Sequence, residues 1–498
     1  MNIRPLTAAC GNLQTVTVYY QLFTRFLFID FINYFSTQMS SLKKCLCALL
    51  LLPALAADAQ QSQPVSLKDL LNRVDQRAPQ LLTDSAAILI RKAQAKEVYN
   101  QWVPNLWLNY QADIGTSNNV IGPYFGFGLV PSSTSGVHNT NVTTAASTNL
   151  GIAELDWEVY NFGAYKAANN VATSDVNVEQ NQFAESKYDL RAYTISSYLE
   201  LLRLQDFAGI QYRDIQRTQE ILRSIRSLAT AGVKAGVDTS LAEAELSKAR
   251  LNYIEVNNQL KHVQLQLSAV TGVPYQAIIP DSTVEVALIN QPAAYLFPMD
   301  TLNHPLINYY KSVYQNSLQR EDLVKKQYNP KILLEAATWD RGSSINANDQ
   351  YNSLSTGYGF QRSDYLVGLG ISYNLFDLRR RQLKLRTQRA NTDYDAKKLQ
   401  EQQELLSISA NQADVEMQTA LDRLKEIPNQ LNAANASYSQ QLSLYRNGLA
   451  NIIDLDAALN ILYRAETDYM QAKYDYANAL FQKAITENQV NSILNLLK

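Results

Sequence analysis

The sequence predicts an α+β fold that is mostly α and internally duplicated, with two β-strands and a long coiled-coil helical hairpin in each repeat. Three observations support this fold. Matching residues recur at fixed separations along the 498-residue chain, alternating strand patterns follow two prolines, and apolar heptads run through the later part of each repeat. Because only 18 Gly and 14 Pro interrupt the chain, long continuous elements are expected.

The duplication appears as pairs of similar residues at constant spacing. The segments RAPQL (77–81) and NHPLI (303–307) each contain a proline that stands 25 residues before a second one, Pro104 or Pro330. Five further pairs are separated by 216 positions: Trp157/Tyr373, Gly232/Gly448, Asp238/Asp454, Ala249/Ala465 and Tyr253/Tyr469. The predicted repeats are therefore 60–290 and 291–498.

Each repeat is expected to contain the same elements in the same order. Proline ends the first helix of each repeat, because its ring removes a hydrogen-bond donor and restricts the preceding residue. In the first repeat we expect a helix at 66–103, strands at about 105–115 and 149–162, and helices at about 164–230 and 233–272. In the second we expect a helix at about 301–329, strands at about 331–341 and 365–376, and helices at about 378–446 and 449–490.

The strand segments alternate between apolar and polar residues. Leu106, Leu108 and Tyr110 occupy every second position of the first strand, and the return strands follow the same period. One apolar and one polar face suit a strand between lipid and a water-filled lumen. An antiparallel sheet that packs on a protein core carries the same alternation, so the strands alone leave both interpretations open.

The helical segments carry heptads with small residues on one edge. Ala242 and Ala249 begin one series, and Ala458 and Ala465 begin the corresponding series in the second repeat. This spacing is typical of coiled coils in which small side chains let helix backbones approach closely. It predicts that the hairpins pack side by side.

The amino-terminal region predicts export. After Met39, two lysines precede the apolar run CLCALLLLPALA and the small-residue positions that signal peptidases prefer. We interpret 39–59 as a signal peptide and 1–38 as an upstream extension of the reading frame. No cysteine follows Cys47, so the exported chain is expected to form neither a disulfide nor a thiolate metal site.

Composition argues against several function classes. A net charge of −2 provides no basic excess for a nucleic-acid partner. His138, His262 and His304 are scattered, without a second ligand at metal spacing, and no nucleophile elbow or phosphate loop occurs. We therefore expect no catalytic residue, no metal site and no cofactor, and predict that the protein is not an enzyme.

Four strands in one chain are too few to close a barrel around an aqueous lumen. An open sheet edge in lipid leaves backbone groups unpaired at a cost of several kcal/mol each. A barrel would therefore have to be shared between copies.

Together, these features resemble the TolC-like outer-membrane efflux protein family. The resemblance rests on the two-fold repeat, the proline before each strand pair, the strand ends Asn161-Phe162-Gly163 and Leu375-Phe376-Asp377, and the Gly-x5-Asp hairpin turns. It implies a homotrimer in the cell outer membrane, with a twelve-stranded barrel that continues into a periplasmic α-helical tunnel. It also implies a periplasmic adaptor protein and an inner-membrane pump of the resistance-nodulation-division (RND) or ABC type. Such a channel passively conducts substrates from the pump in efflux or type I secretion.

The resemblance also assigns roles to residues at the hairpin tips. Gly232, Val233, Gly448 and Leu449 match the paired turns that meet the adaptor. The glycines would also serve simply to turn the chain, because glycine adopts the positive φ that a helix-to-helix turn requires.

Gate residues follow from the same resemblance. Asp238 and Asp454 match acidic positions at the closed periplasmic entrance, with Asp456 as a nearby alternative, and Tyr445 matches a gate tyrosine. Three-fold symmetry would turn Asp454 into a carboxylate ring that binds cations. The alternative role is a helix-start carboxylate favoured by the helix dipole. The basic residue of some members is replaced by Ala450, so a closing salt link would use another partner, such as Arg446 or Lys234, or would be absent.

A second class of function is compatible with the sequence. An exported coiled-coil scaffold of the envelope, with small separate sheets, would show the same repeats and heptads. The transported substrate of a channel is not encoded in any motif, because the pump upstream selects it.

Overall fold

The computed structural model describes residues 65–118, 139–232, 235–289 and 303–496. The expected upstream extension, the signal peptide and Val233 lie outside the described residues. Both repeats fall within one compact unit, Pro64–Lys498.

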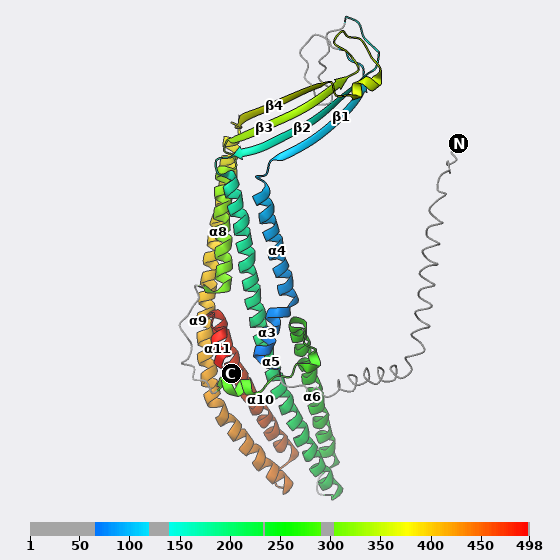
Figure 1. Cartoon of the computed structure of the whole chain (residues 1–498). Helices are drawn as coiled ribbons and strands as arrows, with labels where there is room; N and C mark the ends of the chain where they lie inside the picture. Colours follow the sequence, from blue (N-terminus) through cyan, green and yellow to red (C-terminus); the bar gives the residue numbers. More distant parts are fainter. Residues whose placement is uncertain (1–64, 119–138, 233–234, 290–302, 497–498) are drawn as a thin grey trace, which may run out of the picture. The chain divides into compact units, whose positions relative to one another are not determined.

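In the first repeat the elements follow the expected order (Figure 1). They are α3 (Leu67–Arg77), α4 (Pro79–Asn100), β1 (Asn105–Gly115), β2 (Ala146–Tyr160), α5 (Ala164–Thr230) and α6 (Gly236–Thr271). The short η1 (Tyr275–Ala277) and α7 (Thr283–Ile289) come after them.

The second repeat has the same order. It comprises α8 (Pro305–Lys326), β3 (Lys331–Ser343), η4 (Leu354–Tyr358), β4 (Arg362–Ser372), α9 (Asp377–Arg446), α10 (Ile452–Thr486) and α11 (Val490–Leu496). Pro428 lies inside α9, which continues through it.

The prediction of a single helix at 66–103 is wrong, because the structure has two helices there, α3 and α4. Ala78 has φ −57° and ψ 124°, an extended conformation that a following proline favours, and Pro79 then occupies the first turn of a new helix. The start is as expected: the hydroxyl of Ser66 accepts a hydrogen bond from the backbone N–H of Asp69 at 3.1 Å.

The helix expected at about 449–490 ends slightly earlier, at Thr486. Asn488 then adopts a positive φ of 59°, and the N–H of Gln489 donates to the carbonyl oxygen of Ala484 at 2.6 Å. This left-handed termination satisfies the last carbonyls of α10 and turns the chain into α11.

The four strands form one antiparallel sheet in the order β1-β2-β3-β4, and Figure 1 shows them side by side. The two repeats meet in this sheet through β2 and β3, where Leu155 pairs with Ala336 and Trp157 with Leu334. The strand pairs of the two repeats are therefore one continuous structure rather than two small sheets.

The register aligns the apolar positions of all four strands on one face. Leu106 lies opposite Leu155, Leu155 opposite Ala336, and Ala336 opposite Val367. Paired residues of neighbouring strands point to the same side of a sheet. The other face carries Trp107, Glu154, Ala337 and Leu366 at one level, and Asn105, Asp156, Glu335 and Gly368 at another. The alternation predicted from the sequence thus becomes one face that is mostly apolar and one that is more polar.

Helix α5 lies at the centre of the helical part. It contacts α4 and α6 of its own repeat, and α8 and α10 of the second repeat. Helix α9, the counterpart of α5, makes its extensive contacts with α8 and α10. The predicted heptad positions are buried along these contacts; Ala242, Ala249, Ala458 and Ala465 are all less than 5% exposed.

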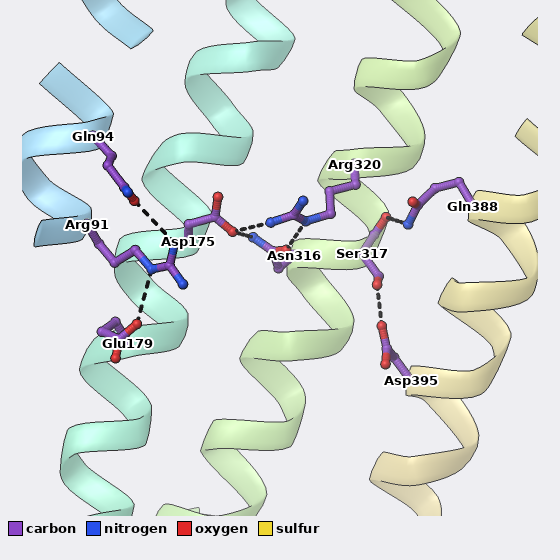
Figure 2. A network of polar contacts seen from close by, with 9 residues as sticks. All are labelled: Arg91, Gln94, Asp175, Glu179, Asn316, Ser317, Arg320, Gln388 and Asp395. Carbon is purple, nitrogen blue, oxygen red and sulfur yellow. Dashed lines mark hydrogen bonds and ion pairs between the residues drawn. The ribbon is translucent and has the colours of Figure 1, made fainter. Parts of the chain in front are cut away.

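A polar network crosses the four helices α4, α5, α8 and α9 (Figure 2). Arg91 of α4 binds Glu179 of α5 at 3.2 Å, and Ser317 of α8 donates a hydrogen bond to Asp395 of α9. These two contacts are equivalent, because Arg91 and Ser317 are 226 positions apart, as Pro104 and Pro330 are, and Glu179 and Asp395 are 216 apart. The duplication therefore extends to individual side-chain contacts.

Tyr198 connects three distant parts of the chain. Its hydroxyl donates to the carbonyl oxygen of Val65 at 3.2 Å and accepts from the N–H of Asp281 at 2.8 Å, and burial raises its pKa to about 12. The side chain is fully buried in a cluster that includes Leu67, Leu201 and Phe481. This cluster joins α3, α5 and α10.

Replacing this hydroxyl tests the role of the connection. Tyr198→Phe leaves the N–H of Asp281 without its acceptor, so the free energy of unfolding is expected to fall by about 1–3 kcal/mol. Tyr193→Phe, at a 43% exposed position of the same helix, is the matched control and should change it by less than about 0.5 kcal/mol. Urea unfolding of the purified protein measures both, and equal midpoints for the two variants would contradict the assignment.

Candidate gate and docking surface at the hairpin tips

Each long hairpin turns at a glycine with left-handed backbone geometry. Gly232 has φ 72° after α5, and Gly448 has φ 77° after α9. At the second tip the N–H of Gly448 donates to the carbonyl oxygen of Tyr445 at 3.0 Å, and the N–H of Leu449 to that of Leu444 at 2.9 Å. The positive φ predicted for both glycines is confirmed.

The tips present apolar side chains to their surroundings. Leu449 is 76% exposed, and Val237 and Ile453, one on the first turn of each return helix, are 75% and 69% exposed. Sequence reasoning missed the last two residues, although they are related by the same 216-residue spacing as the glycines. Together with the turns, they make an exposed apolar surface on each tip.

Tyr445 is fully buried in a cluster that both hairpins build. The cluster contains Ile225 and Leu246 of the first repeat, together with Leu455 and Leu462 of the second. Burial raises the pKa of Tyr445, and the Asp238 carboxylate raises it further. The structure thus brings two of the predicted gate residues together, one from each repeat.

Asp454 occupies the first turn of α10 and is exposed. Its N–H donates at 2.8 Å to the side-chain oxygen of Asn451, which caps the helix. A carboxylate here favours the helix N-terminus. Because Asn451 supplies the cap, the Asp454 carboxylate is not needed to accept a hydrogen bond from the first backbone N–H groups of α10.

Asp456 is half-buried between the two hairpins. With Glu245 of α6 it lines a cavity of about 20 Å³, enough for one water molecule. Burial raises the pKa of Asp456, as does the Glu245 carboxylate, whereas the Lys248 ammonium lowers it. Asn460 donates a hydrogen bond to its carboxylate at 3.0 Å.

Sequence reasoning missed Glu245 and Lys248, which are separated from Asp456 by about 200 positions in the chain. Only the packing of α6 near α10 makes them neighbours. Of the four predicted gate residues, Tyr445 and Asp238 lie near each other, and Asp456 lies near Glu245. Asp454 lies on the exposed side of α10.

None of the helices that the structure describes is long and apolar enough to cross a membrane. Among the same residues, no cluster of three or more His, Cys, Asp or Glu side chains is placed to hold a metal ion.

The outer membrane efflux protein family model matches residues 70–273 and 315–482, one block in each repeat and more than half of the chain in total. The chain belongs to this family. No curated protein matched in sequence.

Solved structures of outer-membrane channels share the fold. The outer-membrane channel OprN is 17% identical, with 85% of this chain and 90% of that chain covered and a TM-score of 0.66. VceC of Vibrio cholerae is 14% identical (86% and 95% covered, TM-score 0.66), and the CmeC channel of Campylobacter jejuni is 13% identical (87% and 89% covered, TM-score 0.67).

Family membership decides between the two classes of function that the sequence left open. The protein is an outer-membrane efflux channel of a tripartite system, with its helical part in the periplasm, and not an envelope scaffold. The efflux family is one of channels rather than enzymes.

The environment of Asp456 predicts a pH-dependent stability. Because the pKa of Asp456 is raised in the folded protein, the protonated carboxyl group favours the folded state. This contribution to stability is lost as pH rises through the raised pKa. Asp456→Asn removes the ionisable group, so the variant is expected to be more stable than the wild type at about pH 8. The difference should disappear below about pH 3, where aspartate is protonated in both states.

Thermal unfolding across this pH range measures the effect. Glu245→Gln provides the second background. In it, Asp456→Asn should raise the thermal stability at about pH 8 by less, because the neighbouring negative charge of Glu245 is gone. A benefit of equal size at both ends of the pH range would show that the ionisation of Asp456 is not its cause.

Proposed function

We propose that three copies of this chain assemble into one channel, with a twelve-stranded barrel in the outer membrane and a tunnel of helices in the periplasm. The four-stranded sheet ends at β1 and β4, and both edges need hydrogen-bonding partners if the sheet lies in lipid. The alignment of apolar residues across all four strands is the observation that carries this proposal. It gives the sheet one face suited to lipid and one suited to water.

The hairpin tips are proposed to dock a periplasmic adaptor protein, which connects the channel to an inner-membrane pump of the RND or ABC type. Gly232, Gly448 and Leu449 are exposed at the tips, and Val237 and Ile453 enlarge the same surface. Exposed apolar side chains at the end of a rigid hairpin fit a protein partner better than they fit solvent. Val233 is proposed to take part because it directly follows Gly232.

The periplasmic gate is proposed to lie directly above these tips. Asp454 is exposed, so three copies around one axis would present three carboxylates at the entrance. Tyr445 with Asp238, and Asp456 with Glu245, lie where the first hairpin meets the second, so they couple the position of one hairpin to the other.

Planar-bilayer recording of the purified protein tests this function. It should form cation-conducting pores that a multivalent cation blocks from the periplasmic side, and Asp454→Ala should weaken the block by about tenfold or more because the carboxylate ring is gone. Asp393→Ala, an exposed carboxylate far along α9, is the control and should leave the block unchanged.

The two parts of the proposal fail separately. Absence of conductance would overturn the channel assembly. Conductance with a block that Asp454→Ala leaves intact would overturn the carboxylate ring and leave the channel standing.

A further inference from the structure

The beginning of α9 is strongly basic. It directly follows β4, where the sheet joins the helical part (Figure 1). Between Leu378 and Thr392 the chain has no acidic residue and six basic ones, which are Arg379, Arg380, Arg381, Lys384, Arg386 and Arg389. All of these side chains are exposed except that of Arg381, which is half-buried. We call residues 379–389 the basic segment.

The first repeat shows that this charge is not needed to build the helix. At the offset of 216, residues 163–173 begin α5 in the same way, directly after β2. They contain one basic residue, Lys166, and it corresponds to Gln382. The same junction between strand and helix is therefore made without a charge at any of the six basic positions of α9.

The basic side chains also lie where they disfavour the helix. The amino-terminal end of a helix carries a partial positive charge, so cations in its first turn are unfavourable. Arg379, Arg380 and Arg381 are among the first five residues of α9, which begins at Asp377. Positive charge that opposes the stability of its own helix indicates a negatively charged partner.

Four of the six basic residues have no ion pair with a described residue. Arg380 is paired with Asp377 at 3.1 Å, and Arg389 with Glu321 of α8 at 3.3 Å. The four others are Arg379, Arg381, Lys384 and Arg386. The basic segment therefore carries charge that this part of the chain does not neutralise.

Exposed apolar side chains come immediately before the basic segment. Leu375 is 71% exposed, Phe376 is 82% exposed and Leu378 is 51% exposed. They follow Leu369 and Ile371 of β4, which are also exposed. Within a few residues the chain thus changes from exposed apolar to exposed basic side chains, which is the order that a bilayer presents from hydrocarbon to charged head groups.

The length of the basic segment fits a head-group layer. A bilayer is about 40–45 Å thick with a hydrocarbon core of about 30 Å, which leaves about 5–8 Å for each head-group layer. Residues 379–384 extend over about 7.5 Å at about 1.5 Å per residue. The long side chain of Arg386 can reach back into the same layer.

We propose that residues 375–386 bind anionic phospholipids in the membrane leaflet that faces the periplasm. The basic side chains bind the phosphate groups, for which the guanidinium group has a matching geometry, and the apolar side chains lie among the acyl chains. The occupant is a lipid surface rather than a soluble anion, because a soluble anion would leave Leu375 and Phe376 exposed. This inference rests on the proposed placement of the sheet in the membrane, and it adds the class of lipid and the residues that select it.

Native mass spectrometry of the purified protein in detergent tests the lipid preference. Phosphatidylglycerol and phosphatidylcholine are added separately at equal concentrations, and bound lipid is measured. Each basic residue near an anionic surface contributes roughly fivefold to the affinity. The wild type is therefore expected to bind phosphatidylglycerol about tenfold or more tightly than phosphatidylcholine.

The test variant is Arg379→Gln/Lys384→Gln/Arg386→Gln, which removes three exposed charges that have no ion pair with a described residue. The preference for phosphatidylglycerol should fall by about fivefold or more. Phosphatidylcholine binding should not change, because its head group has no net charge.

The matched control removes three basic side chains further along the same helix. It is Lys397→Gln/Arg423→Gln/Lys425→Gln, at positions whose side chains are 74%, 65% and 73% exposed. The two triple variants have the same net charge. The control should keep the lipid preference of the wild type, and an equal loss in both variants would overturn the inference.

Thermal unfolding in detergent without added lipid shows whether the test variant is intact. Glutamine removes the unfavourable charges from the start of α9, so the unfolding temperature should be unchanged or slightly higher. A clearly lower temperature would mean that the three charges stabilise the chain itself, which contradicts the inference.

Inorganic phosphate distinguishes a lipid surface from a site for a soluble anion. At millimolar concentration it should displace no more phosphatidylglycerol than chloride does at the same ionic strength. Stronger displacement by phosphate would overturn the lipid assignment. A test variant that binds lipid normally but changes the ion selectivity of the pore would also overturn it, because the basic segment would then line the lumen.

The outcomes also separate this inference from the proposed function. Equal binding of the two lipids by the wild type would overturn the inference and leave the channel assembly intact. A protein that inserts into vesicles of neither phosphatidylglycerol nor phosphatidylcholine would overturn the placement of the sheet in the membrane, and the inference with it.

Discussion

The packing of α5 against the second repeat is the interaction on which the rest of the structure depends. Arg217 forms two hydrogen bonds with Glu466 at 2.9 and 2.7 Å, and the apolar cluster around Tyr445 lies beside this pair. The pKa of Arg217 is raised mainly by its hydrogen bond to Glu466. The pairing of β2 with β3 joins the two repeats in the sheet, and the α5 contact joins them in the helical part, where it fixes the two tips beside each other.

The same packing determines what the tips can do. A glycine turn alone sets only the direction of one hairpin. Tyr445 beside Asp238, and Asp456 beside Glu245, connect the two hairpins just above their turns, so a partner that moves one tip acts on the other. The proposed gate and the proposed docking surface are for this reason treated as one mechanical unit, with the buried Tyr445 at its centre.

Local patterns predicted the elements well, because strand alternation and helix periodicity are encoded in neighbouring residues. The bounds of α5 and the phase of Leu106 and Leu108 in β1 followed from these patterns. The break at Ala78 was missed, because the apolar pattern continues across Pro79 and only the backbone restriction before proline reveals it.

The candidate site was less predictable than the fold. The glycine turns were identified from the repeat, and the same spacing would have identified Val237 and Ile453. The burial of Tyr445 and the neighbours of Asp456 were not accessible, because they depend on contacts between residues about 200 positions apart.

The central claim is that two repeats held together along α5 form one third of a closed channel. An electron cryomicroscopy reconstruction of the purified protein in lipid nanodiscs measures this most directly. We expect three copies with twelve strands closed in the lipid. A sheet that ends open in lipid, or a barrel closed by a number of copies other than three, would contradict it.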